Sequence, residues 1–328
     1  VTGDTLWIKQ AQGSTSKHRL VGSTICYAGN GLYCLDINTG LEQWRIQNNS
    51  TQSLTDFTSA NNKIYAFFDL GGGIFGDSTK LYEINPLSGI SLEKFTLYGR
   101  SRDGYNQGPL GMVYYRHSNG NEIIFTQAQS HNPIIITSRG EYYAIDISND
   151  SMYWDLEDYF YDGDINSKGI GSPPVLVGKN VLLNNGWIYN ASLNLETKTV
   201  SWNTQVPTSY RTGGGKMAEL NGKLFQSLGN ASNFNIINTN DGSFYKNYNT
   251  LGFDNWAPAL MKHNNHIYFS SNKGFYKMDA NGTIVKQLLR SDKLSEDVSG
   301  TIQTFDIDPT TGYIYATVGN NIICIKEK

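Results

Sequence analysis

The chain has 328 residues, a net charge of −3 and 17% charged residues, against about 25% in an ordinary globular protein. This balance argues against a nucleic-acid-binding protein, because such proteins carry a basic surface. No apolar run reaches the roughly 18 residues of a transmembrane helix. Residues 1–10 also lack the basic start and apolar run of a signal peptide, so we expect a soluble chain that is mature or trimmed.

The segment Ser23–Ile46 contains the first copy of a repeated unit. An alternating run is followed by a turn at Gly29–Gly31, a second run over Leu32–Ile37, a turn at Asn38–Gly40 and a third run that includes Trp44. Alternating apolar runs joined by short Gly- and Asn-containing turns predict antiparallel strands connected by hairpins. The 34 glycines of the chain, against 8 prolines, suit many such turns.

The same order of runs and turns recurs along the chain. Further copies lie at residues 62–95, 122–154, 180–202, 223–245 and 266–286, and a last copy at 312–328 ends after its third run. Each copy is preceded by a run that predicts an innermost strand, at residues 18–21, 55–60, 110–115, 174–177, 216–220, 258–262 and 301–307.

One residue near the end of each third run marks the repeat. Successive markers are 41 to 61 residues apart, within or near the ~40–50 residues of a propeller blade. Four strands in seven copies predict an all-β fold, a seven-bladed β-propeller of four-stranded antiparallel blades. A two-sheet sandwich would not account for seven recurrences. The markers are Asp36, Asn85, Asp146, Asn194, Asn238, Asp279 and Lys326.

The strand missing from the last copy is predicted at the start of the chain. Residues 4–8 have the character of an outer strand, and Trp7 stands where the first copy has Trp44. We therefore expect residues 1–10 to complete the last blade, at 301–328, and to close the ring. No linker-like segment divides the chain, so residues 1–328 are predicted to form a single domain.

The residues Leu32–Asp36, with Thr39, Gly40 and Trp44, resemble the LYALD-x-x-TG-x-x-x-W repeat of the pyrroloquinoline-quinone (PQQ) type, or quinoprotein-like, propellers. Residues 143–146 with Trp154 fit the same pattern. Other copies depart from it: Asn replaces Asp at three markers, and Phe95 and Tyr245 lie near where Trp would fall. In each copy Asp or Asn would cap a turn, Gly would take a positive φ and Trp would fill the wedge between blades.

The resemblance also implies a test for cofactor chemistry. Quinoprotein dehydrogenases hold PQQ with a Trp and a disulfide between adjacent cysteines, and bind Ca²⁺ through carboxylate and Asn ligands near a catalytic Asp. This sequence has no adjacent cysteines and is shorter than those enzymes. We therefore expect no PQQ and assign no catalytic residue, although a lyase or hydrolase with Asp and Arg or Tyr at the propeller axis remains an alternative.

The cysteines and a possible calcium-binding loop each allow two interpretations. Cys26 and Cys34 would face each other across a hairpin, close enough for a disulfide, but Cys324 and Ala144 occupy positions equivalent to Cys34, which favours small, buried, reduced residues. Asp162, Asp164 and Asn166 resemble the opening of a calcium loop. The loop lacks the turn glycine and closing glutamate of that motif, and a solvated acidic loop is the alternative.

Four long loops that follow predicted outer strands are rich in aromatic side chains beside polar ones. Aromatic rings stack on sugars or anchor protein partners, and polar groups fix orientation, although the rings could simply cover the loops. Loops at the ends of a rigid scaffold are where binding residues concentrate. The candidate ligand-binding residues are Tyr98, Arg100, Arg102, Tyr105, Tyr159, Tyr161, Tyr210, Arg211, Phe253, Asp254 and Trp256.

These observations favour a non-catalytic binding propeller that recognises a glycan or a protein on its loop-rich face. The alternative is a periplasmic or outer-membrane assembly scaffold, similar to the outer-membrane assembly propellers of Gram-negative bacteria, which would dock proteins on the same face. The family resemblance and the low-charge, Asn- and Tyr-rich composition place the chain outside the cell, at its surface or in the periplasm. No nucleic acid is expected as a partner.

Overall fold

A computed structural model of the chain describes residues 17–70, 78–98, 106–107, 111–132, 137–156, 172–185, 189–207, 213–229, 234–248, 260–271, 274–290, 302–307, 312, 314–318 and 321–325. Throughout these ranges the regular elements are β-strands, paired in antiparallel sheets. The chain divides into two compact units, residues 1–166 and 167–328. Each unit is described by itself.

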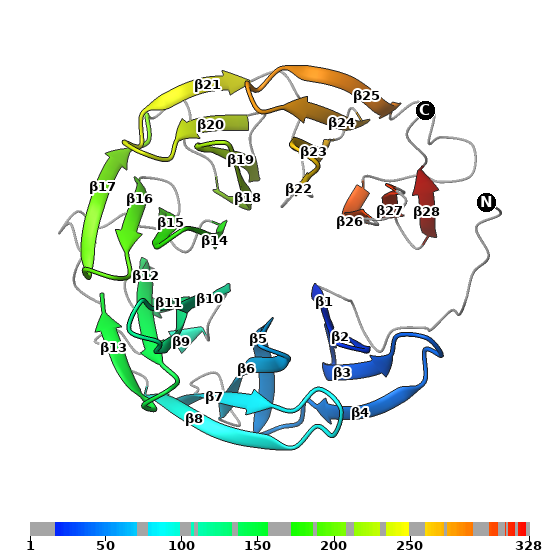
Figure 1. Cartoon of the computed structure of the whole chain (residues 1–328), viewed down its shortest axis with the longest axis vertical. Coiled ribbons are helices and arrows are strands. Elements are labelled where there is room, and N and C mark those ends of the chain that lie inside the picture. Colours follow the sequence, from blue (N-terminus) through cyan, green and yellow to red (C-terminus); the bar gives the residue numbers. More distant parts are fainter. Residues whose placement is uncertain are drawn as a thin grey trace. The chain divides into compact units, whose positions relative to one another are not determined.

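The described residues of the first unit form three sheets (Figure 1). Two of them follow chain order over four strands, and in the third β9 pairs with β11 beside the path β10–β11–β12–β13. The first strands of neighbouring sheets lie together, because β1 contacts β5 and β5 contacts β10. The strands are β1 (Lys17–Val21), β2 (Thr24–Gly29), β3 (Gly31–Asp36), β4 (Glu42–Gln47), β5 (Gln52–Ala60), β6 (Lys63–Leu70), β7 (Ser78–Ile84), β8 (Ser91–Tyr98), β9 (Asn106–Gln107), β10 (Met112–Arg116), β11 (Glu122–Asn132), β12 (Thr137–Asp146) and β13 (Ser151–Asp155).

The second unit continues the pattern with three four-stranded sheets and one three-stranded sheet among its described residues. Here too the first strands adjoin, since β14 contacts β18 and β18 contacts β22. The strands are β14 (Ser172–Val177), β15 (Asn180–Asn185), β16 (Tyr189–Asn194), β17 (Thr199–Gln205), β18 (Gly213–Leu220), β19 (Lys223–Gly229), β20 (Phe234–Asn238), β21 (Phe244–Tyr248), β22 (Leu260–His263), β23 (His266–Ser271), β24 (Gly274–Asp279), β25 (Ile284–Arg290), β26 (Ile302–Ile307), β27 (Ile314–Val318) and β28 (Asn321–Ile325).

The predicted repeat is therefore confirmed at the level of all-β, antiparallel four-stranded sheets. The hairpins between first and second strands are tight: Asn61 and Asn62 have φ of 50° and 56°, and Asn264 and Asn265 have φ of 42° and 59°. Two consecutive positive φ values are the signature of two-residue hairpin turns whose twist matches the strands, and Asn tolerates them well. Residues 1–10, predicted to complete the last blade, lie outside the described residues.

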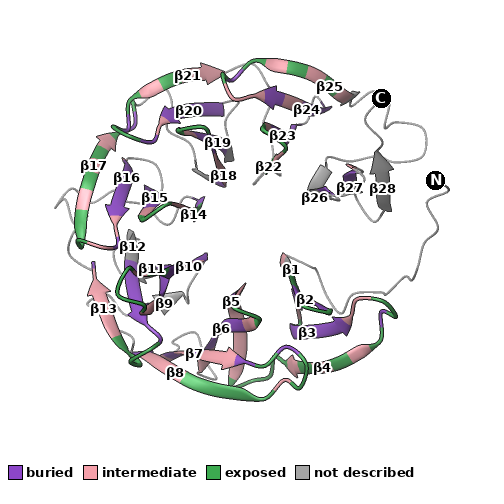
Figure 2. Cartoon of the chain, in the orientation of Figure 1, coloured by how far each residue is buried: buried purple, intermediate pink, exposed green. Residues whose placement is uncertain are grey.

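Burial follows the position of a strand within its sheet (Figure 2). The third strand β3 is buried at five of its six positions, whereas the fourth strands β4 and β17 alternate between exposed and half-buried residues. Period-two alternation is expected of an edge strand with one face in solvent. Large aromatic side chains fill the space between sheets, and Phe57, Phe68 and Phe125 are almost completely buried.

Five of the marker residues cap turns as predicted, whereas Asn238 donates from Nδ2 to the hydroxyl of Ser243 at 2.8 Å. The Oδ1 atom of Asp36 accepts hydrogen bonds from the N–H groups of Asn38 (3.0 Å) and Thr39 (2.9 Å), and Asn85 does the same for Leu87 (2.9 Å) and Ser88 (3.2 Å). Asp146, Asn194 and Asp279 accept equivalent bonds from their own turns. Asp and Asn serve equally well because only the Oδ1 acceptor is needed for the two N–H groups.

This equivalence gives a prediction at position 85. Replacing Asn85 by alanine removes the acceptor for two turn N–H groups and is expected to lower the free energy of unfolding by about 1 kcal/mol, as loss of a capping side chain does. Asn85→Asp should be neutral within roughly 0.5 kcal/mol. Urea unfolding of both variants measures the difference, and equal losses would contradict the capping role.

The tryptophans also occupy the expected wedges. Trp44 on β4 donates from Nε1 to the carbonyl oxygen of Pro86 at 2.7 Å, and Trp202 on β17 donates in the same way to Thr239 at 2.7 Å. Each bond links a fourth strand to the turn of the next sheet. A Cβ atom on Gly89 would lie 2.8 Å from the Trp44 ring, so glycine in this turn gives the indole room as well as adopting φ +71°.

One expectation is corrected. Reduced cysteines were favoured, but Cys26 and Cys34 form a disulfide between register partners of β2 and β3. Both side chains are fully buried. A position that favours a small buried side chain therefore also allows a cross-strand disulfide, because directly opposed residues of an antiparallel pair have their Cβ atoms close together.

Candidate functional site

The predicted ligand-binding residues fall almost entirely outside the described ranges. Tyr98 is the last residue of β8, and its side chain is not among those described. The other candidates and the possible calcium ligands lie outside: Arg100, Arg102, Tyr105, Tyr159, Tyr161, Tyr210, Arg211, Phe253, Asp254, Trp256, Asp162, Asp164 and Asn166. Their role as a site therefore stays a prediction.

What the structure does describe is the end of each sheet from which these loops leave. The loops follow the fourth strands β8, β13, β17 and β21. In an antiparallel sheet the fourth strand ends on the side where the first strand begins and the second strand ends. We call this side of each sheet the loop end. Its polar side chains are the candidate site that can be examined in detail.

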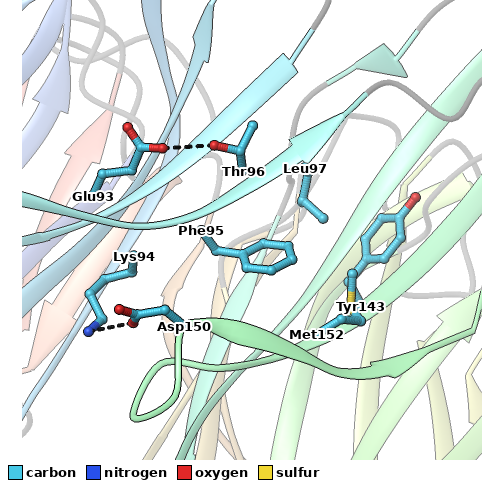
Figure 3. A pocket seen from close by; sticks show the side chains of 8 residues that line it. All are labelled: Glu93, Lys94, Phe95, Thr96, Leu97, Tyr143, Asp150 and Met152. Atoms are coloured by element: carbon cyan, nitrogen blue, oxygen red, sulfur yellow. Dashed lines mark hydrogen bonds and ion pairs between the residues drawn. The ribbon is translucent and has the colours of Figure 1, made fainter.

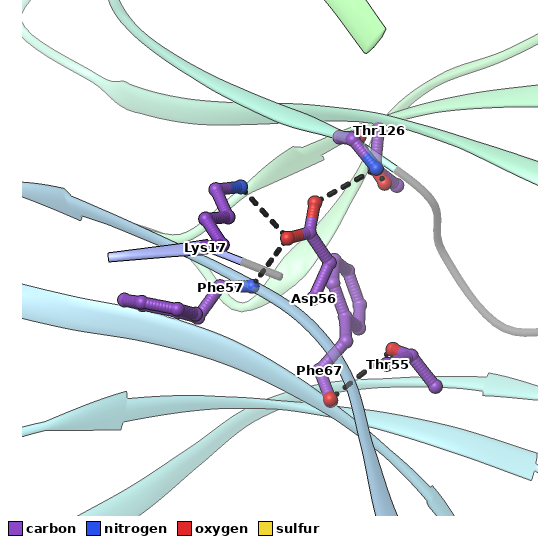
Figure 4. Close-up of polar contacts among 7 residues, drawn as sticks. Lys17, Thr55, Asp56, Phe57, Phe67 and Thr126 are labelled. Atoms are coloured by element: carbon purple, nitrogen blue, oxygen red, sulfur yellow. Dashed lines mark hydrogen bonds and ion pairs between the residues drawn. The ribbon is translucent and has the colours of Figure 1, made fainter. Parts of the chain in front are cut away.

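The loop end of the first unit is held by a largely buried carboxylate, that of Asp56 on β5 (Figure 4). Its Oδ1 atom lies 2.7 Å from Nζ of Lys17 on β1 and accepts the N–H of Phe57 at 2.8 Å. Its Oδ2 atom accepts the N–H of Gly111, just before β10, at 2.7 Å. The carbonyl of Gly111 in turn accepts the hydroxyl of Thr126 at 3.0 Å.

This arrangement joins three successive sheets at one charged group. The side chains of Lys17 and Asp56 are 20% and 11% exposed, so the ion pair is largely withdrawn from water. The contacts of the Asp56 carboxylate therefore hold the inner strands of these sheets together.

One feature of the sequence points to this group. Asp56 is the only charged residue of the strand Gln52–Ala60, and charged residues are almost never buried unless they are paired. Its partners lie 39 and 55 residues away along the chain. Their identity therefore depends on how the sheets pack.

Among the described residues, the loop end of the second unit contains a cluster of neutral polar side chains. Asn184, Asn190 and Gln226 are 3%, 0% and 0% exposed. The Oδ1 atom of Asn190 accepts hydrogen bonds from Nδ2 of Asn184 at 2.9 Å and from Nε2 of Gln226 at 2.8 Å. Among the described residues, Oδ1 of Asn184, Nδ2 of Asn190 and Oε1 of Gln226 find no partner. Two acceptors and one donor in a buried cluster can hold an ordered water molecule.

Asp69, near the loop end of β6, is a half-buried carboxyl. Burial raises the pKa of the Asp69 carboxyl above its usual value, and the hydrogen bond from the Thr79 hydroxyl at 2.7 Å opposes the shift. A raised pKa means that the folded state binds protons more readily than the unfolded state. The contribution of Asp69 to the free energy of unfolding is therefore fully present below the pKa that the carboxyl has in the unfolded chain. It is lost as the pH rises through the pKa of the folded chain.

Asp69→Asn is accordingly expected to raise the melting temperature at pH 7, where the native carboxyl is charged and partly desolvated, and to change it little at pH 3. The amide keeps an acceptor for Thr79 without a charge. Thermal unfolding at the two pH values checks the result. A variant that is less stable than the parent at pH 7 would show that the charged Asp69–Thr79 bond outweighs the desolvation.

A pocket of about 540 Å³ lies in the first unit, between β8 and the hairpin of β12 and β13 (Figure 3). It is formed by both apolar and charged side chains and lies away from the group around Asp56. An ion pair between Lys94 and Asp150, with Nζ and Oδ1 2.6 Å apart, stands at its edge. The lining residues are Glu93, Lys94, Phe95, Thr96, Leu97, Tyr143, Asp150 and Met152.

Two further properties bear on function. Within the ranges that the structure describes, no three His, Cys, Asp or Glu side chains come together as potential metal ligands. A search of the same residues found no helix with the length and hydropathy needed to span a membrane.

The sequence matches no family model and no curated protein. Among solved structures, the fold is similar to that of BamB from Moraxella catarrhalis, at 14% sequence identity and a TM-score of 0.57, over 93% of this chain and 79% of that chain. It is also similar to the computationally designed Ika8 protein, at 10% identity and a TM-score of 0.63, over 95% of this chain and 86% of that one. At these identities the likeness concerns the fold, and together with the repeated antiparallel sheets it supports a β-propeller.

Proposed function

We propose that the chain forms one seven-bladed propeller over residues 1–328, of the quinoprotein-like type but without its cofactor, in which residues 1–10 supply a fourth strand beside β28. The support is that β26–β28 form a three-stranded sheet among the described residues, whereas the six other sheets have a four-stranded path. Cys324 on β28 and Cys34 on β3 hold equivalent positions, because each lies on a third strand and pairs with a residue of the second strand. On its other side, Cys34 pairs with Trp44 of the fourth strand. Trp7 would then lie opposite Cys324.

Trp7→Cys tests this closure. If the strand pairs as proposed, the new cysteine forms a disulfide with Cys324 under mild oxidation, and a linked peptide is found by mass spectrometry without reduction. Ile8→Cys, whose side chain would point to the other face, is the control and should not link. Equal linking at both positions, or none at position 7, would contradict the pairing.

We propose further that the protein is a non-catalytic scaffold that binds another protein at the loop end. The observation that carries this proposal is the group around Asp56. Its carboxylate contacts tie together residues at the first strands of three sheets, which provides a rigid base for the long loops. Binding residues on loops benefit from such a base. The fold shared with BamB supports the assembly-scaffold alternative over a glycan-binding role.

The disulfide bears on where such a scaffold would work. Disulfides form and persist in oxidising compartments and are rare in the cytosol. The buried Cys26–Cys34 pair supports the proposal that the protein is extracellular, at the cell surface or periplasmic. The same location would suit either a protein or a glycan partner, so the partner must be separated by experiment.

Site-specific photocrosslinking separates the two partner classes. A benzoyl-phenylalanine placed at Tyr210 or Trp256 is expected to give a discrete protein adduct in cells of the source organism. Benzoyl-phenylalanine in place of Leu87 or Leu92, which are 62% and 59% exposed on the first unit, should give no protein adduct. A glycan array with the parent and Trp256→Ala runs in parallel. Glycan binding that the substitution abolishes, without a loop-specific protein adduct, would overturn the protein-scaffold proposal.

A further inference from the structure

The pocket beside β8 lies where other sheet junctions are filled. In four of the described sheets the fourth strand has one residue that pairs with the third strand just before a register shift. At three junctions this residue donates to the turn of the next sheet. Trp44 donates to Pro86, Trp202 to Thr239, and Lys246 from Nζ to Gly282 at 3.1 Å. Two of the three donors are indoles.

At the junction after β8 the equivalent residue is Phe95, which pairs with Leu81 before the shift. A phenyl ring is smaller than an indole and has no N–H group to donate. The turn also differs, because the position of Gly40, Gly89 and Gly242 is taken by Asp150, with φ 51°. Lys94 supplies the link to the next sheet in place of residue 95, through its ion pair with Asp150.

The result is a pocket with apolar walls and an edge that carries two carboxylates. Phe95, Leu97 and Met152 provide the walls, and Figure 3 shows the Phe95 ring directed toward Tyr143 and Met152. Glu93 and Asp150 contribute two carboxylates, which pair with the ammonium groups of Lys80 and Lys94. Carboxylate oxygens accept hydrogen bonds, so this edge favours a ligand that presents N–H donors rather than acceptors.

We propose that this pocket binds the indole ring of a tryptophan on a partner polypeptide. The ring would pack on Phe95 and Met152, as the protein's own indoles pack at equivalent junctions, and its N–H would donate to the Asp150 carboxylate. Ring packing on aromatic and thioether groups is favourable. The pocket lies between two neighbouring sheets and not at the loop end, so the inference does not depend on the proposed function.

Methyl NMR of methionine gives a direct measurement. Met152 lines the pocket, whereas Met278 is fully buried in the second unit and serves as an internal control. N-acetyl-tryptophanamide is expected to shift the Met152 methyl signal in a saturable way, with a dissociation constant on the order of 1 mM. N-acetyl-leucinamide should bind at least about tenfold more weakly, since it lacks the ring and its donor. The Met278 signal should not move.

The source of the indole is tested with a Gly-Lys-Trp-Gly peptide blocked at both ends. The lysine of the peptide can reach the exposed carboxylate of Glu93 and compete with Lys80 for it, so we expect the peptide to bind several-fold more tightly than the amide. Equal affinity of the two probes would overturn the assignment to a polypeptide. Absence of a Met152 shift with either probe at about 20 mM, well above the expected constant, would overturn the indole site itself.

Two variants check the position of the ring. Phe95→Trp fills the pocket from within and should abolish the Met152 shift, while Leu92→Trp, at an exposed position of the same strand, should leave it unchanged. If Phe95→Trp does not give a native spectrum, Asp150→Gly restores the glycine of the other turns and removes the acceptor. It should weaken binding about tenfold. A shift that survives both substitutions in folded protein would contradict the proposal.

Discussion

Trp202→Ala is expected to lower the free energy of unfolding by about 3 kcal/mol, the lower end of the range for truncating a large aromatic side chain in a core. The indole packs against the cluster formed by Leu182, Leu224 and Ile237 and donates to the carbonyl of Thr239. Its loss leaves a void beside Gly242, where a Cβ atom would already lie 2.5 Å from the ring. Urea unfolding, followed by far-UV circular dichroism, measures the change.

Two controls separate packing from hydrogen bonding at this junction. Trp202→Phe keeps most of the ring but removes the N–H donor, and we expect a loss of roughly 1–2 kcal/mol. Leu92→Ala, at a side chain that is 59% exposed, should stay within about 0.5 kcal/mol of the parent. A loss of less than 1 kcal/mol in Trp202→Ala would show that the wedge contributes little to stability.

Asp56→Ala is expected to have an effect of similar size, a loss of about 3 kcal/mol, because breaking a largely buried ion pair leaves the other charge uncompensated. The Lys17 ammonium loses its carboxylate partner, and the N–H groups of Phe57 and Gly111 lose an acceptor. Since these donors belong to three sheets, the first unit should lose contacts at each of its inner strands. Chemical denaturation of the purified chain measures the loss.

The exposed ion pair between Lys80 and Glu93 is the matched control. Its N–O distance is 2.6 Å, close to that of the Lys17–Asp56 pair, but the side chains are 28% and 43% exposed. Glu93→Ala should therefore cost less than about 1 kcal/mol. A double-mutant cycle of Lys17→Met with Asp56→Ala isolates the pair itself. If Asp56→Ala costs no more than Glu93→Ala, burial does not strengthen the contact.

The strands and their turns could be predicted because the information is local. Alternation with period two places the core-facing residues of each strand, and an Asp or Asn followed by Gly four residues later sets the turn, as at Asp36 and Gly40. Even the wedge was predictable from Trp44. These features need only a few neighbouring residues to be recognised, and they recur often enough to confirm one another.

The pocket and the charged group at the loop end could not be predicted in the same way. The pocket results from two departures from the repeat, Phe95 and Asp150, which come together only when β8 packs against the next sheet. The Asp56 group depends on partners in two other sheets. The disulfide was one of two open interpretations, because spacing allowed the contact without deciding the oxidation state of the two thiols.

The links from fourth strands to the turn of the following sheet couple the stability of neighbouring sheets. Trp44 and Pro86 are 42 residues apart in the chain but belong to adjacent sheets, so the stability of one sheet enters that of its neighbour as an interface contribution, as in other repeat proteins. Loss of the Trp44 bond should therefore accelerate amide hydrogen exchange in the turn at residues 85–90 before it affects more distant sheets. Cooperativity would spread from neighbour to neighbour, and the weakest interface would set where the molecule first opens.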